Sequence, residues 1–137
     1  MKKYKIIIVE NDEDEQQFMK EGFDSAALFE IVAQVRNGDT LFEWLNTNVD
    51  SLPDVILSDL NMPGKNGYDV INEVKTNPLY SHIPVVITST SSTKTIIEKC
   101  LSSGAADYIV KPETFIEYVP YVQNLYKRIQ EKQLVKY

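Results

Sequence analysis

Short apolar runs alternate with longer amphipathic stretches along this chain. Five of the runs are expected to be strands, and four of these are continuously apolar, as in strands that are covered on both faces. The runs are residues 5–9, 28–35, 55–57, 85–87 and 108–110. Between and after them, apolar residues recur at helical spacing, which predicts five helices around residues 18–23, 41–45, 70–74, 96–101 and 115–129.

Two helix boundaries carry their own signals. Gly104 is placed to end the fourth helix. Pro120 lies inside the last helical pattern, where a proline removes a backbone donor. Either this helix is kinked, or it starts near Pro120 after a separate turn. Thr114 and Glu117 resemble a capping box and favour an early start.

Strict alternation of strands and helices predicts an α/β fold, in which helices cover both faces of a parallel sheet. Right-handed crossovers leave few topologies, and the strand order 2-1-3-4-5 is the one we expect. A length of 137 residues suits one domain.

Charge and cysteine content narrow the classes of function. The net charge of −6 repels phosphate backbones and anionic lipids, so we expect neither a nucleic-acid partner nor a membrane. The lone Cys100 excludes an intrachain disulfide, and its apolar setting predicts a buried structural thiol. The apolar run at residues 6–9 is too short for a signal peptide, and no segment is long enough to span a membrane. We therefore expect a soluble, cytoplasmic protein.

Polar residues follow the apolar runs where the strands are expected to end. They are Glu10, Asn11 and Asp12 after the first, Asp59 after the third, Ser89 after the fourth and Lys111 after the fifth. Ligands of open parallel sheets bind at this edge. Clustered carboxylates repel one another, which a hard cation such as Mg²⁺ relieves. An Asp carboxylate can attack phosphorus and form an aspartyl-phosphate, so the crevice suits phosphoryl chemistry.

Four segments, in order, resemble the response-regulator receiver family. They are residues 7–12 (IIVEND), 54–64 (DVILSDLNMPG), 84–89 (PVVITS) and 104–112 (GAADYIVKP). The resemblance covers nearly the whole chain. It implies a doubly wound five-stranded parallel sheet in the order 2-1-3-4-5, the flavodoxin-like three-layer sandwich. It also implies that residues 1–137 form a single receiver domain with no output domain, similar to a stand-alone chemotaxis regulator.

The acceptor and its cationic partner follow from the resemblance. It implies that Asp59 accepts a phosphoryl group from the phosphohistidine of a sensor histidine kinase or a phosphotransfer protein. Lys111 matches the lysine that pairs with the acceptor and then with the phosphoryl group. Pro112 matches a proline that is often preceded by a cis peptide bond in this family.

The metal ligands are where this chain departs from the family. By resemblance, Glu10, Asn11, Asp59 and the carbonyl of Asn61 would hold Mg²⁺. The family usually has an acid at the position of Asn11, so the neutral amide removes one charge toward the metal. Either metal binding is weakened, or Asp12 reaches in and compensates. The extreme of the first alternative is a pseudo-receiver, a binding module with weak or no phosphorylation.

Two further residues match the switch of the family. Ser89 matches the hydroxyl that moves to a phosphoryl oxygen on activation, with Thr88 or Thr90 as the alternative if the register is off by one. Tyr108 matches the aromatic residue that turns inward as the hydroxyl moves. An ordinary half-buried strand tyrosine is an equal alternative.

The function predicted from these residues is a phosphoryl-accepting switch that acts on a downstream protein target. It would not be an enzyme beyond self-catalysed phosphorylation and dephosphorylation. A haloacid-dehalogenase-type phosphatase would need a second Asp where Asn61 stands, and a cap domain. A flavin-binding protein would need a phosphate loop after the first strand, where residues 10–15 are instead mostly acidic.

Overall fold

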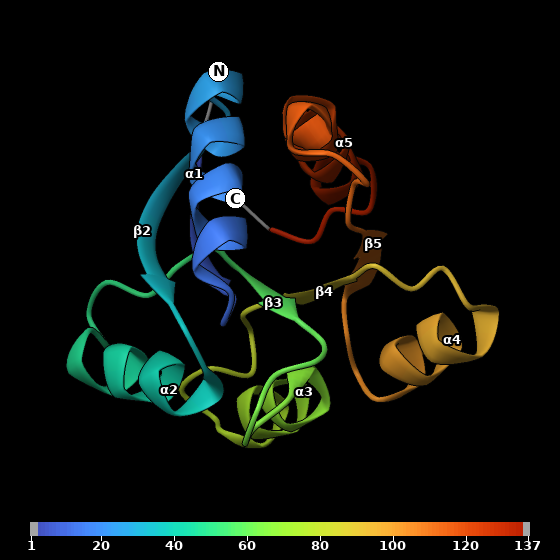
Figure 1. Ribbon diagram of the computed structural model, residues 1–137. Helices are drawn as coiled ribbons and strands as arrows, with labels where there is room; N and C mark the ends of the chain where they lie inside the picture. The colour runs from blue at the N-terminus through green and yellow to red at the C-terminus, as the bar shows by residue number, and fades with distance from the viewer. Residues whose placement is uncertain (1–2, 136–137) are drawn as a thin grey trace.

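Five parallel strands form the central layer of the computed structural model, which describes residues 3–135 (Figure 1). They are β1 (Tyr4–Val9), β2 (Phe29–Val35), β3 (Val55–Asp59), β4 (Val85–Ser89) and β5 (Asp107–Val110). Their order in the sheet is β2-β1-β3-β4-β5, which confirms the predicted topology.

Helices cover both faces of this sheet. On one face lie α1 (Glu13–Ala26) and α5 (Tyr118–Glu131), and on the other lie α2 (Gly38–Thr47), α3 (Gly67–Thr76) and α4 (Lys94–Ser102) (Figure 1). A short 3₁₀ turn, η1 (Phe115–Glu117), precedes α5. Among residues 3–135, no helix combines the length and the apolar character needed to cross a bilayer.

Side chains of each strand alternate between two apolar cores. Ile6 and Ile8 pack with α1 and α5, while Ile7 and Val9 pack with α2, α3 and α4, and all four are fully buried. Burial on both faces explains why the strands read as continuous apolar runs. Cys100 is fully buried on α4, as predicted.

Two strands continue further than the apolar runs indicated. The predicted ends of β3 and β4, at residues 57 and 87, were wrong by two residues, because Ser58, Asp59, Thr88 and Ser89 continue the ladder. The N–H of Leu60 still donates to the carbonyl of Thr88 at 3.1 Å. Backbone pairing with neighbouring strands thus carries the sheet past the change from apolar to polar side chains.

The structure decides where the last helix begins. The N–H and hydroxyl of Thr114 donate to a carboxylate oxygen of Glu117 at 3.3 and 2.9 Å and fix the separate turn η1. Pro120 then lies in the first turn of α5, where a missing N–H leaves no helical bond unmade. The helix therefore starts near Pro120 after a separate turn. At the end of α4, Gly104 has a φ of +113°, and the helix stops before it as predicted.

Gly22 allows α1 to approach α5 closely. A Cβ atom at this position would lie 2.6 Å from the Cβ of Tyr118. Gly22→Ala is therefore expected to lower the free energy of unfolding by about 1–2 kcal/mol, which is the cost of overpacking less the helix-propensity gain of Ala. Urea unfolding measures this difference. Ser25→Ala, at an exposed position of α1, is the control and should not destabilise the protein. An unchanged midpoint for Gly22→Ala would contradict the close approach.

Candidate functional site

Three charged side chains meet at the carboxyl ends of β1, β3 and β5. The Nζ atom of Lys111 lies 2.7 Å from Oε1 of Glu10 and 3.2 Å from Oδ1 of Asp59. All three side chains are more than nine-tenths buried. The strand order brings them together, because β3 lies beside β1 and each strand presents its last residues at the same edge.

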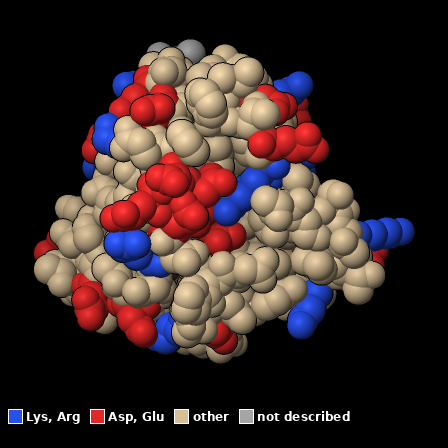
Figure 2. Space-filling model, in the orientation of Figure 1, with Lys and Arg blue, Asp and Glu red and all other residues tan. Residues whose placement is uncertain are grey.

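The charges of this cluster do not balance. Two carboxylates share one ammonium group, which leaves an excess of one negative charge. Burial raises the pKa of Glu10 and of Asp59, although Lys111 opposes this rise. Burial alone would lower the pKa of Lys111, but its two carboxylate partners raise it, so the lysine stays charged. Figure 2 shows acidic side chains gathered near the middle of this face, with basic side chains against them.

A network of hydrogen bonds holds the loop after β1. The side-chain amide of Gln16 donates to the carbonyls of Glu10 at 2.7 Å and of Val35 at 3.1 Å. The N–H of Asp12 donates to Oε2 of Glu10 at 3.1 Å. Gln16 was not among the residues predicted for the site. Its only signal in the sequence is its place one helical turn after the acidic loop.

Asp12 stabilises the start of α1. It is the N-cap of α1, and its carboxylate accepts the N–H of Glu15 at 3.0 Å. The backbone carbonyl of Asn11 accepts a long hydrogen bond from the Arg36 guanidinium at 3.4 Å. Within residues 3–135, no group of three His, Cys, Asp or Glu side chains is arranged to hold a metal ion. Asp12 therefore caps α1, and its compensation for Asn11 stays a prediction.

The donor set nevertheless fits a hard cation. The carboxylates of Glu10 and Asp59 are oxygen donors with an uncompensated charge, and Asn11 and the exposed Asn61 can add neutral oxygens close to them in sequence. Mg²⁺ prefers oxygen ligands of this kind and needs few of them from the protein, because it keeps several waters.

Ser89 and Tyr108 both bind the loop between β4 and α4. The Ser89 hydroxyl accepts the N–H of Ser91 at 3.2 Å, and the buried Tyr108 donates its hydroxyl to the Ser91 carbonyl at 2.7 Å. The hydroxyl of Thr88 is instead bonded to Ile109 and to Tyr121. Of the three hydroxyls considered for the switch, Ser89 is thus the buried one that faces this loop, whereas Thr90 is exposed.

The expectation for Pro112 was wrong in one respect. Every peptide bond within residues 3–135 is trans, so the structure has no cis bond before Pro112. Trans is the commoner state of bonds to proline.

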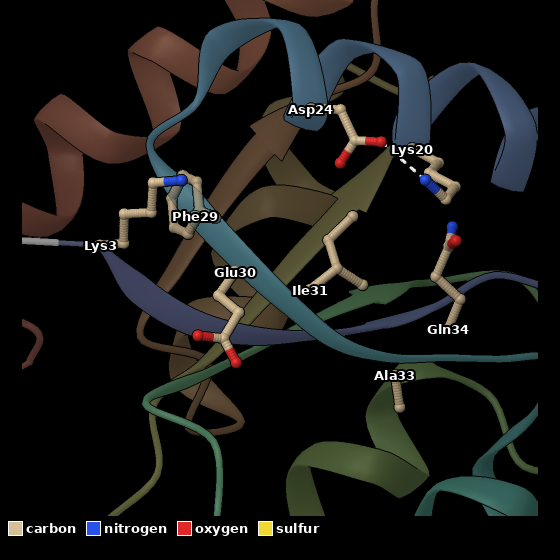
Figure 3. Close-up of a pocket in the computed structure, with 8 residues that line it drawn as sticks. All are labelled: Lys3, Lys20, Asp24, Phe29, Glu30, Ile31, Ala33 and Gln34. Carbon is tan, nitrogen blue, oxygen red and sulfur yellow. Dashed lines mark hydrogen bonds and ion pairs between the residues drawn. The ribbon is translucent and has the colours of Figure 1, made fainter.

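A separate hollow of about 520 Å³ lies beside the edge strand β2 (Figure 3). Its lining residues come from Lys3, α1 and β2, and include the ion pair between Lys20 and Asp24 at 2.6 Å. None of the clustered charges described above lines it. The candidate site is therefore the shallow, charged edge of the sheet and not this hollow.

Comparison with known proteins shows which family the chain is similar to. Residues 6–123 match the sequence profile of the response regulator receiver domain. Two-component response regulator ORR12 of Oryza sativa subsp. japonica is 45% identical over 78 residues, which are 56% of this chain and 64% of that protein. Chemotaxis protein CheY1 of Helicobacter pylori is 28% identical over 110 residues, which are 80% of this chain and 86% of that protein.

A solved structure extends the likeness to the fold. The phosphorylated cyanobacterial phytochrome response regulator RcpA superposes with a TM-score of 0.77 at 31% identity, covering 90% of this chain and 91% of that one. The chain spans less than two thirds of the length of the rice regulators that it matches. The profile match and the shared fold together show that the chain belongs to the response regulator receiver family, the phosphorylated signalling switches of two-component systems.

Proposed function

We propose that Asp59 accepts a phosphoryl group from the phosphohistidine of a sensor histidine kinase or a phosphotransfer protein, and that this modification switches a protein-binding face. The observation that carries the proposal is the buried Asp59 carboxylate at the end of β3, 3.2 Å from the Lys111 ammonium. The likeness to RcpA, which has been solved in phosphorylated form, supports it.

The transfer needs one nucleophile and a set of charges that receive the phosphoryl oxygens. A carboxylate oxygen of Asp59 forms the new bond to phosphorus as the bond from phosphorus to the donor nitrogen breaks, and that electron pair stays on the donor. Lys111, 3.2 Å from Asp59, would bind one phosphoryl oxygen, and the buried Ser89 would donate to another once its hydroxyl has moved toward it. Bound Mg²⁺ would neutralise further phosphoryl charge, held by Asp59, Glu10, Asn11 and Asn61.

Movement of the Ser89 hydroxyl would change the loop that leads into α4. Drawing it toward a phosphoryl oxygen breaks its bond to the Ser91 N–H and frees the loop to which Tyr108 is bonded. That loop leads into α4, whose N-cap Thr93 makes no side-chain capping bond and whose one fully buried side chain is Cys100. A weakly anchored helix responds readily to such a change. We expect the resulting face, made by α4, β5 and α5, to bind a downstream protein, with no direct nucleic-acid or membrane partner.

Incubation with Mg²⁺ and acetyl phosphate tests this function. Intact mass spectrometry is expected to show one phosphoryl adduct that hydroxylamine removes and that does not form when Mg²⁺ is chelated. A phosphorylated histidine protein serves as the second donor. Absence of an adduct with both donors would reject the switch and favour a pseudo-receiver that binds partners without being phosphorylated.

Asn11→Asp is expected to tighten Mg²⁺ binding about tenfold, because it adds one full negative charge beside the cluster and water screens much of that gain. Isothermal titration calorimetry measures the affinity directly. Asn72→Asp, on the exposed side of α3, is the matched control and should leave the affinity unchanged.

Asp12→Asn tests whether Asp12 compensates for Asn11 in binding Mg²⁺ or only caps α1. Asparagine caps a helix as well as aspartate does, so α1 should stay intact. If Asp12 only caps α1, through its bond to the N–H of Glu15, the Mg²⁺ affinity of this variant should match that of the native protein. A marked loss of affinity would show instead that Asp12 compensates for Asn11.

A further inference from the structure

Two buried hydroxyls behind the site take no part in the chemistry described so far. The Tyr121 hydroxyl donates to Oγ1 of Thr88 at 2.7 Å, and Thr88 donates in turn to the carbonyl of Ile109 at 2.9 Å. Thr88 is fully buried, and Tyr121 is 6% exposed. Two consecutive hydrogen bonds therefore join α5 to the last residues of β4 and β5.

The backbone at Thr88 lies between the acceptor and the lysine. Thr88 pairs with Asp59 on β3, and its carbonyl accepts the N–H of Leu60 at 3.1 Å. On the other side, the carbonyl of Ser89 accepts the N–H of Lys111 at 2.8 Å. Any displacement of the end of β4 would consequently move Ser89 and disturb the backbone beside both Asp59 and Lys111.

The pair is a polar insertion in an otherwise apolar layer. The side chains around it on this face of the sheet include Leu57, Val86 and Ile109, all buried. Apolar side chains could fill the same space, but their contacts are not directional and would allow the end of β4 to shift. A satisfied pair of buried hydroxyls adds direction, because each bond holds only in a narrow range of geometry.

The neighbouring Tyr118 provides an internal comparison. Its ring packs edge-on against that of Tyr121, with centroids 5.3 Å apart, and it belongs to the same turn of α5. Its hydroxyl is bonded to Glu15 on α1 and not to a strand end. Two tyrosines of similar burial thus differ in whether their hydroxyl reaches the sheet.

We propose that Tyr121 and Thr88 form a positioning pair that holds the end of β4 in place, keeps Ser89 and Lys111 correctly set around Asp59, and couples the state of the site to α5. This inference rests on the proposed phosphorylation of Asp59. Neither residue contacts the phosphoryl group, and both act through their neighbours.

Tyr121→Phe tests the pair with little risk to the fold, because Thr88 keeps its bond to Ile109 and no buried donor is left unsatisfied. The rate of phosphorylation by acetyl phosphate with Mg²⁺ is expected to fall about fivefold, roughly the factor that one net hydrogen bond is worth. Thr88→Ser retains the hydroxyl and should keep the native rate. Tyr118→Phe is the matched control and should also keep it.

A second measurement reports whether phosphorylation of the site is coupled to α5. Amide hydrogen exchange in residues 118–131 is expected to change on phosphorylation of the native protein and of Tyr118→Phe, and to change less in Tyr121→Phe. A purely structural role would alter the thermal midpoint of Tyr121→Phe without altering this response.

The outcomes separate the two proposals. If the native protein is phosphorylated and Tyr121→Phe matches it in both rate and exchange response, the positioning pair is rejected and the proposed function stands. If the native protein takes up no phosphoryl group from any donor, the proposed function fails and the pair fails with it.

Discussion

Lys111→Met is expected to slow phosphorylation of Asp59 by about 100-fold or more, the loss typical of removing one preorganised charge from a reacting centre. Methionine keeps much of the length and apolar bulk of the lysine stem but has no ammonium. The Nζ atom it removes lies within 3.2 Å of both carboxylates, and the side chain is only 7% exposed, so water cannot readily replace it. The initial rate of adduct formation with acetyl phosphate at saturating Mg²⁺ is the measurement.

The control for Lys111→Met is Lys20→Met, which removes a lysine from an exposed ion pair and should leave the rate unchanged. A native rate for Lys111→Met would contradict the role given to this lysine.

Lys111→Met also carries a prediction about pH. Without the ammonium, burial and mutual repulsion would raise the pKa of Glu10 and Asp59 further. A carboxyl group whose folded-state pKa lies above its unfolded value binds more protons when folded, so its stability contribution falls as pH rises. The thermal midpoint of Lys111→Met should therefore fall more than that of the native protein between about pH 5 and about pH 8.

Asp107→Asn is expected to lower the free energy of unfolding by about 2–3 kcal/mol. The Asp107 carboxylate at the start of β5 accepts two hydrogen bonds from Arg128, at 2.7 and 2.8 Å, and one from Lys132 at 3.1 Å. Asp107 is 4% exposed, but its two partners on and after α5 are 36% and 44% exposed. Breaking a fully buried pair costs about 3–5 kcal/mol, and the access of water to both cations here reduces that cost.

The same contacts set a pH dependence on the acid side. Burial alone would raise the pKa of Asp107, but the hydrogen bonds from Arg128 and Lys132, with that of its neighbouring backbone N–H, lower it. A carboxylate with a lowered pKa contributes its full stability above its unfolded pKa and loses it as pH falls through the folded value. Urea midpoints of the native protein should therefore fall in acid, and those of Asp107→Asn should fall less.

Asp24→Asn, in an exposed ion pair, is the control for Asp107→Asn and should change the urea midpoint little at any pH. Equal midpoints for Asp107→Asn and the native protein near neutral pH would show that this ion cluster does not stabilise the fold.

The sequence was most informative where local pattern and chain order were sufficient. Continuous apolar runs predicted strands buried on both faces, and their alternation with helices predicted the strand order. Because parallel strands end at one edge, the sequence also predicted that the charges of Glu10, Asp59 and Lys111 would converge, and the structure places both carboxylates within 3.2 Å of the Lys111 Nζ atom.

Features that depend on contacts between distant elements could not be predicted in this way. Asp107 stands in one of the family segments, but nothing in the sequence shows that Arg128, 21 residues later, turns toward it. Gly22 resembles any helical glycine until Tyr118 is seen against it. The bond between Tyr121 and Thr88 joins a helix to a strand end, and hydrophobic periodicity carries no information about such a bond.

Mapping the phosphoryl group to one residue tests the central claim most directly. After reaction with acetyl phosphate and Mg²⁺, reduction of the acyl phosphate with borohydride followed by peptide mass spectrometry should place the label on Asp59, and Asp59→Asn should carry none. A label on another carboxylate, or an adduct of native yield in Asp59→Asn, would contradict the assignment of Asp59 as the acceptor.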